Sequence, residues 1–358
     1  MISRKQIAVY VGRRFVLAFC AIMGVLILLL FFIEMLENLR RIGSNEAPLW
    51  VGLLVTGLRL PWLSEQMLPF AVLFASMATF MMLSRSNELI VIRAAGVSVW
   101  QFLMPVMLSA LALGLLASLA YNPLAAHMLE RHQVVFAEWF GTAPQTQTAW
   151  LRQSGPEGSS VFYAGSAATS GDALTVVTAY LYDQDNVFLQ RIEAERAFLE
   201  RGVWRLEDAV ILESGAEPRR VAEIEVGTLL TAAQVRENLT SAETIGFWQL
   251  PNYIDIAQRS GLNARPLQME FHSLLAQPLL FIAMALIAGT FSLRLFRYGN
   301  IGRMILAGIG SGFLLYVALN LMRDLGTVGL VPTVLAAWIP GFVALIVGST
   351  LLLFQEDG

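Results

Sequence analysis

The stretch SRSNELIVIRAAGVSV, residues 84–99, is a short polar segment between two long apolar runs. The preceding run covers about residues 49–83, and the following run covers residues 100–121. Each is long enough to cross a bilayer, which takes about 20 apolar residues. Two spans joined by a short charged segment predict a polytopic α-helical membrane protein.

The pattern within residues 84–99 predicts a short helix whose first turn carries Glu88, near the positive end of the helix dipole. Leu89 and Ile92 share one face of it, and Arg85 can pair with Glu88 beside that face. A small helix joined rigidly to two spans is suited to act as a lever for a soluble partner. The alternative is an ordinary charged loop. The candidate coupling residues of this lever are Arg85, Glu88, Leu89, Ile92 and Arg93.

Composition agrees with a membrane protein. Of 358 residues, 56% are hydrophobic and 14% are charged, whereas roughly a quarter of a soluble domain is charged. A net charge of −3 without a basic cluster argues against a nucleic-acid partner. A single cysteine, Cys20, excludes a disulfide framework. The histidines are too widely spaced for a shared metal and are expected to be structural or interfacial: His127, His132 and His272.

Hydropathy predicts six spans, at about residues 15–38, 53–83, 100–121, 270–293, 302–322 and 333–354. Four cations precede the first span and hold the N-terminus in the cytoplasm: Arg4, Lys5, Arg13 and Arg14. Alternation then makes both termini and the basic segments 84–99 and 294–303 cytoplasmic. The chain is expected to contain three parts: residues 1–124 with three spans, residues 125–265 outside, and residues 266–358 with three more spans.

Residues 125–265 have the composition of a soluble domain. Runs rich in β-branched and aromatic residues, such as LTVVTAYLYD (174–183) and VWRLEDAVILE (203–213), alternate with turn residues. Several antiparallel strands at this spacing predict a sandwich or an open roll. An open roll could hold acyl chains, whereas a plain β domain could bind a partner at its edge strand.

Charged residues cluster at the end of the first span and within the second. Charges near bilayer depth are costly and usually face protein or a water-filled cavity. They could be side chains that snorkel at a helix end. They could also line a cavity for an amphiphile with an anionic head group, with arginines as phosphate partners. The candidate lipid- or phosphate-binding residues are Glu34, Glu37, Arg40, Arg41, Arg59 and Glu65.

Motifs for catalysis are absent from the sequence. It has no GxxxxGK[ST] loop, no HExxH and no GxSxG, and it lacks the paired intramembrane aspartates of an intramembrane protease. We therefore expect a non-catalytic membrane protein without catalytic residues, metal ligands or a cofactor of its own.

Four blocks of sequence resemble a known family. They are RSNELIVIRAAGVSVWQF (85–102), RLPWLSEQMLPFAVLFASMATFMMLSR (59–85), FHSLLAQPLLFIAMALIAGTFSLR (271–294) and LAAWIPGFVALIVGSTLLLFQEDG (335–358). The family comprises the permease subunits of the lipopolysaccharide-export ABC transporter, LptF and LptG (YjgP/YjgQ). The resemblance covers essentially the whole length and is greater to the LptG branch.

The resemblance implies six membrane helices, a periplasmic β-jellyroll-like domain after the third, and a place in the bacterial inner membrane. It implies an LptF-like sister permease, an LptB-like ATPase dimer that alone binds ATP, and an LptC-like single-span bridge protein. It also implies that residues 84–99 are the coupling helix, with Glu88 docked in the ATPase groove. Arg40 and Arg41 would lie where the family's gate helix meets the lipid A phosphates.

The function implied is extraction of lipopolysaccharide from the inner membrane towards a periplasmic bridge. Lifting a lipid from the bilayer costs roughly 0.8 kcal/mol per CH₂. Because the sequence has no nucleotide-binding motif, a partner must supply the work through a cytoplasmic lever. Two alternatives are a mechanical ABC permease, which releases lipoproteins or transmits force without a lipid cavity, and a scaffold membrane protein without an ATPase.

Overall fold

The computed structural model describes residues 4–45, 47–85, 98–140, 149–155, 158–167, 173–183, 187–200, 202–213, 218–228, 242–259, 263–296 and 301–356. The chain divides into two compact units. The membrane unit comprises Met1–His132 and Ala242–Gly358, and the β unit comprises Gln133–Ser241.

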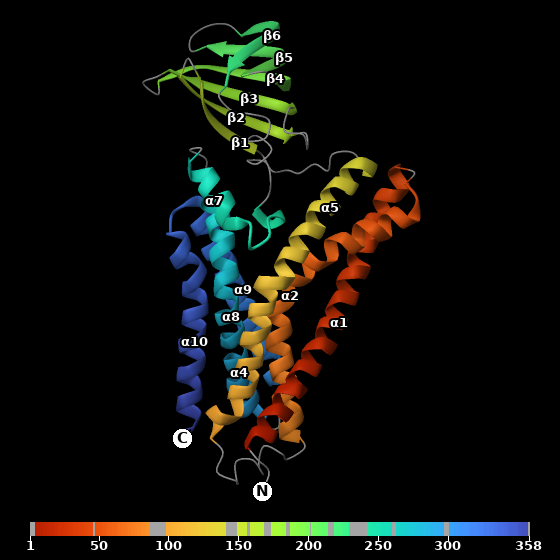
Figure 1. Ribbon diagram of the computed structural model, residues 1–358, viewed down its shortest axis with the longest axis vertical. Helices are drawn as coiled ribbons and strands as arrows, with labels where there is room; N and C mark the ends of the chain where they lie inside the picture. Colours follow the sequence, from red (N-terminus) through yellow and green to blue (C-terminus); the bar gives the residue numbers. More distant parts are fainter. Residues whose placement is uncertain are drawn as a thin grey trace. The chain divides into compact units, whose positions relative to one another are not determined.

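Within the described residues, six helices are long and apolar enough to span a membrane. The predicted six-span fold with an inserted β region is therefore confirmed, although the helices extend beyond the predicted ends of the spans (Figure 1). The helices are α1 (Arg4–Asn45), α2 (Leu49–Arg85), α4 (Val99–Leu116) continuing into α5 (Asn122–Phe140), α8 (Arg265–Phe296), α9 (Ile301–Val328) and α10 (Thr333–Glu356).

The third span continues further than its sequence indicated. The sequence predicts that it ends at about residue 121, but the helix continues past Pro123 as α5 to Phe140. A π turn, Ala117–Tyr121, precedes the proline, and the Asn122 N–H donates to the Ala117 carbonyl five residues back. A π turn shifts the hydrogen-bonding register locally, so the helix passes a residue that has no N–H to donate.

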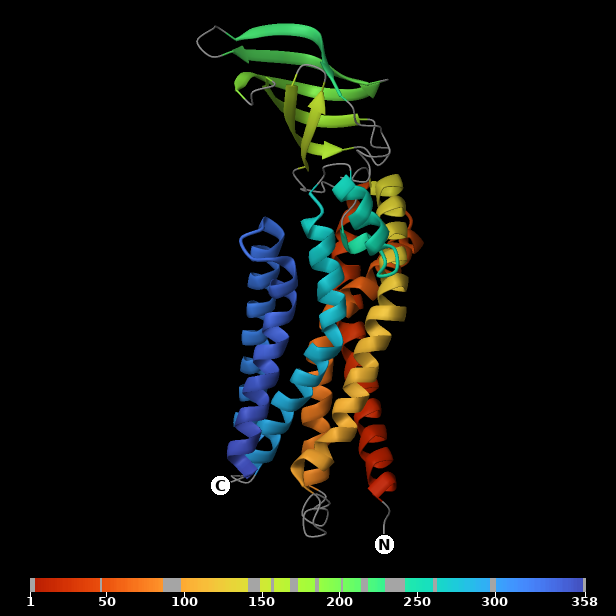
Figure 2. The same cartoon turned by 60° about the vertical axis from the view of Figure 1, so that its left-hand side comes forward.

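Helix α8 is the centre of packing in the membrane unit. It contacts α2, α4, α9 and α10, and Figure 2 shows it running between the α9–α10 pair and the other long helices. The contact with α4 is tight at Gly114, where an added Cβ would lie 2.5 Å from the Cα of Pro278. Small residues allow helix backbones in a membrane to approach in this way. The same occurs between α9 and α2, where a Cβ at Gly312 would lie 2.7 Å from a methyl carbon of Leu73.

The described residues of the β unit form six antiparallel strands in the order β1-β2-β3-β4-β5-β6. Their bounds are Ala149–Gly155, Gly158–Ala167, Ala173–Tyr182, Phe188–Glu200, Val203–Glu213 and Arg219–Gly227. This meander differs from the Greek-key order of a closed jelly roll. Of the two shapes predicted, the described strands form the open roll. The largest fully buried side chains of its apolar core are Phe162, Leu174, Ile192, Trp204 and Leu206.

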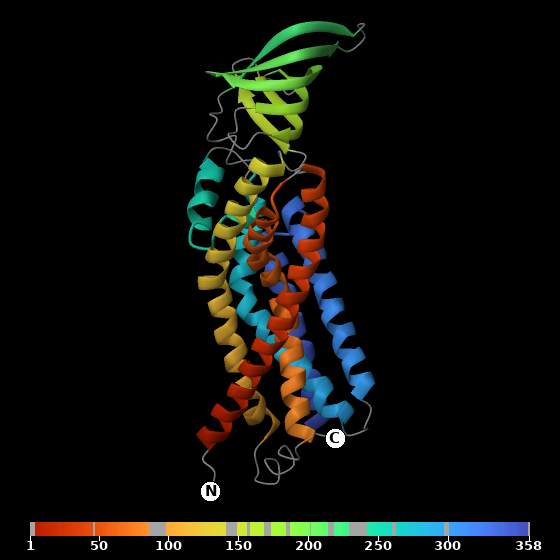
Figure 3. The ribbon, with the colours of Figure 1, turned by 90° about the vertical axis from the view of Figure 1, so that its right-hand side faces the viewer.

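The sheet is strongly curled, as Figure 3 shows. Val176 in β3 and Asp208 in β5 both have a φ of 52°, a left-handed backbone conformation that is rare for such residues. The strand register pairs the residues on either side of these two but not the two themselves. Local breaks of this kind bend strands, and they account for the curl.

Replacing Gly114 by alanine should destabilise the membrane unit. The added methyl group would meet the Pro278 backbone, which cannot move aside as a flexible side chain would. Overpacking of this kind costs about 1–3 kcal/mol in unfolding free energy. The measurement is the thermal unfolding midpoint of the full-length protein in detergent. Gly24→Ala is the matched control because a Cβ at Gly24 meets nothing within 4 Å. Equal midpoints for the two variants would contradict this packing account.

Candidate functional site

The predicted coupling residues fall almost entirely outside the described residues. Glu88, Leu89, Ile92 and Arg93 are among residues 86–97, which the structure does not describe. Arg85, the last residue of α2, is exposed. The coupling role of this segment stays a prediction.

An ion pair joins α1 to α2 and contains two of the predicted phosphate-binding residues. Arg59 Nη1 lies 2.7 Å from Glu34 Oε1, and the guanidinium carbon lies 5.9 Å from the centroid of the Trp62 ring. The Arg59 side chain is 38% exposed and that of Glu34 is 11% exposed. About one turn along α1, Asn38 Nδ2 donates to Thr56 Oγ1 of α2 over 2.9 Å, and both residues are buried. These polar contacts hold the two helices in one register.

A second group of predicted residues lies at the C-terminal end of α1. Glu37 is 3.2 Å from Arg41 and 3.9 Å from Arg40. The Arg40 side chain is 85% exposed. Two guanidinium groups share one carboxylate here, so residues 37–45 at the end of α1 carry one net positive charge.

Glu65, the sixth predicted residue, lies in a different cluster. It accepts a hydrogen bond of 3.1 Å from Asn122 Nδ2, rather than pairing with Arg59. Glu270 of α8 forms an ion pair with Arg323 of α9. These groups and Glu243 of the short 3₁₀ turn η2 (Ala242–Thr244) interact electrostatically with Glu65. The structure thus divides the predicted set among three places and adds residues that the sequence did not single out.

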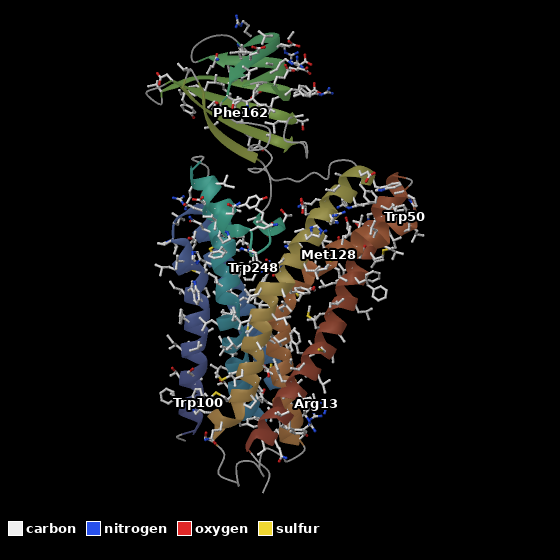
Figure 4. All side chains as sticks on the ribbon, viewed as in Figure 1. Arg13, Trp50, Trp100, Met128, Phe162 and Trp248 are labelled. Carbon is white, nitrogen blue, oxygen red and sulfur yellow. The ribbon has the colours of Figure 1, made fainter. Side chains whose placement is uncertain are left out.

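The segment that follows the β unit docks onto the break between α4 and α5. Pro123 has no N–H, so the Leu119 carbonyl lacks its usual donor four residues on. The Trp248 indole N–H donates to this carbonyl over 2.9 Å, and Figure 4 shows Trp248 beside this helix. The Phe247 N–H donates to Asn122 Oδ1, also over 2.9 Å. A Cβ at Gly246 would lie only 3.1 Å from the Pro123 Cα. We call these contacts of residues 246–248 with Leu119, Asn122 and Pro123 the clasp.

Ser118 joins the same break to α8. Its hydroxyl donates to the Leu274 carbonyl over 2.7 Å, and that carbonyl also lacks its usual donor because Pro278 follows four residues later. Apolar contacts hold the same returning segment, from Ile245 into α7 (Leu250–Arg259), against α8. The cluster contains Ile245, Phe247, Leu250 and Leu274.

Glu243, in η2 at the start of the returning segment, lies near the carboxylate of Glu270. Burial and the neighbouring Glu270 raise the pKa of Glu243 above its ordinary value of 4.5, and together they outweigh the lowering by Arg323. Sequence reasoning missed Glu243 and Glu270 because their partners lie on other segments of the chain. The sequence did contain a local sign of the break between α4 and α5, namely the Asn122-Pro123 pair within an otherwise helical stretch.

Comparison with known proteins agrees with this architecture. The sequence matches the family described as lipopolysaccharide export system permease LptF/LptG over residues 9–353, which includes nearly all of every spanning helix. The chain belongs to this family. Membership makes it a permease component of a transport system. With the spanning helices, it also implies a place in the inner membrane.

Two curated relatives carry the name lipopolysaccharide export system permease protein LptG. The Haemophilus influenzae protein is 22% identical over 97% of this chain and 98% of its own length. The Escherichia coli K12 protein is 23% identical over 96% of this chain and 97% of its own length. The expected resemblance to the LptF/LptG family, and to LptG in particular, is therefore confirmed.

We expect the returning segment, residues 242–259, to be bound most stably to the membrane helices at acid pH. A raised pKa means that the docked state binds a proton at Glu243 more tightly than a solvated carboxylate would. This contribution is complete below pH 4.5, the ordinary value, and it is lost as the pH rises through the raised value. The charged groups that face Glu243 are Glu65 on α2, Glu270 on α8 and Arg323 on α9.

Glu243→Gln tests this expectation because glutamine resembles the protonated acid at every pH. Thermal midpoints of the full-length wild type and variant should agree at acid pH, and the wild type should fall below the variant towards neutral pH. Asp255→Asn, a change on an exposed position of α7, controls for general charge removal. If the thermal midpoints of the wild type and Glu243→Gln changed with pH in parallel, the titration of Glu243 would not affect docking.

Proposed function

We propose that this chain is the permease subunit that extracts lipopolysaccharide from the inner membrane and passes it towards a periplasmic bridge. A separate cytoplasmic ATPase supplies the energy. The observation that carries the proposal is the cation-rich end of α1 in a six-span member of the lipopolysaccharide export permease family. The predicted topology places this end of α1 at the periplasmic side.

The end of α1 is chemically suited to an anionic lipid head group. Guanidinium groups bind phosphate through two parallel hydrogen bonds. Arg40 and Arg41 project from the same end of α1, and both contact Glu37 through ion pairs that are exposed or half exposed. Ion pairs of this kind contribute little free energy. A phosphate group with more charge than a carboxylate can therefore replace Glu37 as their partner at small cost.

The work of extraction is proposed to enter through residues 84–99. Helix α2 ends at Arg85 and α4 begins at Val99, at the two ends of this segment, and both helices pack against α8. A force on the segment would consequently reach the central helix of the membrane unit. The proposed partners are an LptB-like ATPase dimer that docks at Glu88, an LptF-like sister permease and an LptC-like single-span bridge protein. The β unit would receive the lipid on the periplasmic side.

Reversing the charge at the end of α1 tests the lipid contact. Arg40→Glu with Arg41→Glu should abolish most photo-crosslinking between this chain and lipopolysaccharide in membranes, because two carboxylates repel phosphate. Arg40→Lys with Arg41→Lys is the matched control: it keeps the charge and should keep most of the crosslinking. Protein yield after purification reports on folding. Undiminished crosslinking in the double Glu variant would favour a permease without a lipid cavity.

Glu88→Ala tests the lever. The variant should insert and be purified at the wild-type yield, because residue 88 lies between spans and not within one. It should, however, fail to recover the ATPase when the chain is captured from native membranes in mild detergent, and lipopolysaccharide should not reach the cell surface. Glu88→Asp should restore part of both functions. Normal export by Glu88→Ala would exclude this acid as the coupling group.

A further inference from the structure

The ion pair between Glu34 and Arg59 joins an accessible arginine to a largely buried acid, unlike the ion pairs of Arg40 and Arg41. We infer that Glu34 acts as a charge filter, which makes Arg59 selective for phosphate monoesters over phosphodiesters. Glu34 is thus a specificity-determining residue. The inference rests on the proposed function, since it requires that this face of α1 and α2 meets the head groups of anionic lipids.

The Arg59 side chain is accessible, but the carboxylate of Glu34 already neutralises its charge. Its side chain is 38% exposed, while Glu34 is only 11% exposed at a distance of 2.7 Å. The buried Asn38–Thr56 hydrogen bond of 2.9 Å fixes the helices beside the pair. Close packing adds to this, because a Cβ at Gly52 of α2 would lie 2.3 Å from the end of the Ile42 side chain of α1. The backbones that carry Glu34 and Arg59 are therefore held close together, which keeps the carboxylate within reach of the guanidinium group.

An anionic ligand must compete with Glu34 for the Arg59 guanidinium. A phosphodiester carries one negative charge, as the carboxylate does, so the exchange gains no electrostatic energy. It also leaves the largely buried Glu34 without its partner, which is unfavourable. A phosphate monoester carries about −1.5 to −2 charges at pH 7 and three acceptor oxygens. It can attract Arg59 more strongly than Glu34 does and offset the loss.

The same argument gives Glu37 no such role. Its ion pairs with Arg40 and Arg41 are longer, and its own side chain is 47% exposed. Water can replace either partner there, so a competing phosphate of either kind meets little resistance. The bilayer surrounds these helices with phosphodiester lipids in large excess, which would occupy an unguarded arginine. Discrimination between the two kinds of phosphate therefore falls to Glu34.

Binding of two matched lipids to the full-length protein tests the inference. The probes are phosphatidic acid, a monoester, and phosphatidylglycerol, a diester, with identical acyl chains; phosphatidylcholine measures background. Native mass spectrometry in detergent gives the bound fraction of each. We expect the wild type to prefer phosphatidic acid by roughly fivefold, the size of a charge-assisted hydrogen bond at a half-exposed site. Glu34→Gln should bring this ratio close to one by increasing phosphatidylglycerol binding.

Two further variants complete the design. Glu37→Gln removes an acid from the same helix and should increase the binding of both lipids without changing their ratio. Glu34→Gln with Arg59→Gln removes both charges, so it should bind less of both lipids than Glu34→Gln alone. The thermal unfolding midpoint of this double variant, compared with that of the wild type, shows whether the protein folds without the ion pair.

The possible outcomes distinguish a failure of the charge filter from a failure of the proposed function on which it rests. A wild type that binds neither anionic lipid above the phosphatidylcholine background would overturn both. A wild type that prefers phosphatidic acid, with the same preference in Glu34→Gln, would overturn the charge filter and leave the proposed function standing. An equal change of the ratio in Glu37→Gln would also overturn the filter, because the effect would then be general to acids on α1.

Discussion

Inside a bilayer no water is available to satisfy a backbone carbonyl, so each must find its partner within the protein. This constraint explains the contacts at the break between α4 and α5. Pro123 removes the donor that the Leu119 carbonyl would use, and Trp248 supplies another from a distant segment. Ser118 does the same for the Leu274 carbonyl of α8. The breaks at Pro123 and Pro278 are therefore also places where two segments are joined by a hydrogen bond.

The clasp fastens both covalent connections of the β unit at one place. The outgoing chain passes through Asn122 at the start of α5, and the returning chain reaches Phe247, whose N–H donates to the Asn122 side chain. Asn122 also donates to Glu65 of α2. A movement of α2 would thus alter the hydrogen bonds that hold both connections. Glu243 lies in the returning chain, where burial and Glu270 raise its pKa, so we expect the strength of this attachment to depend on proton binding.

The burial of each ion pair determines how readily its arginine can exchange its acidic partner for a ligand. The Glu270–Arg323 pair joins α8 to α9 with a largely buried acid, and such a pair is costly to break. Arg40 is almost fully exposed and can change partners freely. Arg59 lies between these extremes, because it is accessible while its partner is not. This intermediate situation is the basis of the charge selectivity that we infer for Arg59.

The sequence by itself determined the six spans, the inserted β region and the family, because these depend on hydropathy over about 20 residues, on strand-length patterns and on continuous motifs. It also drew attention to Arg59 and Glu65, since charges at bilayer depth are unusual. Only the tertiary structure decided their partners. Arg59 pairs with Glu34, 25 residues away on another helix, and Trp248 reaches Leu119 across 129 residues. Contacts of this kind depend on how each helix is rotated about its axis. That rotation is set by packing between helices, such as Gly114 against Pro278, which no local pattern records.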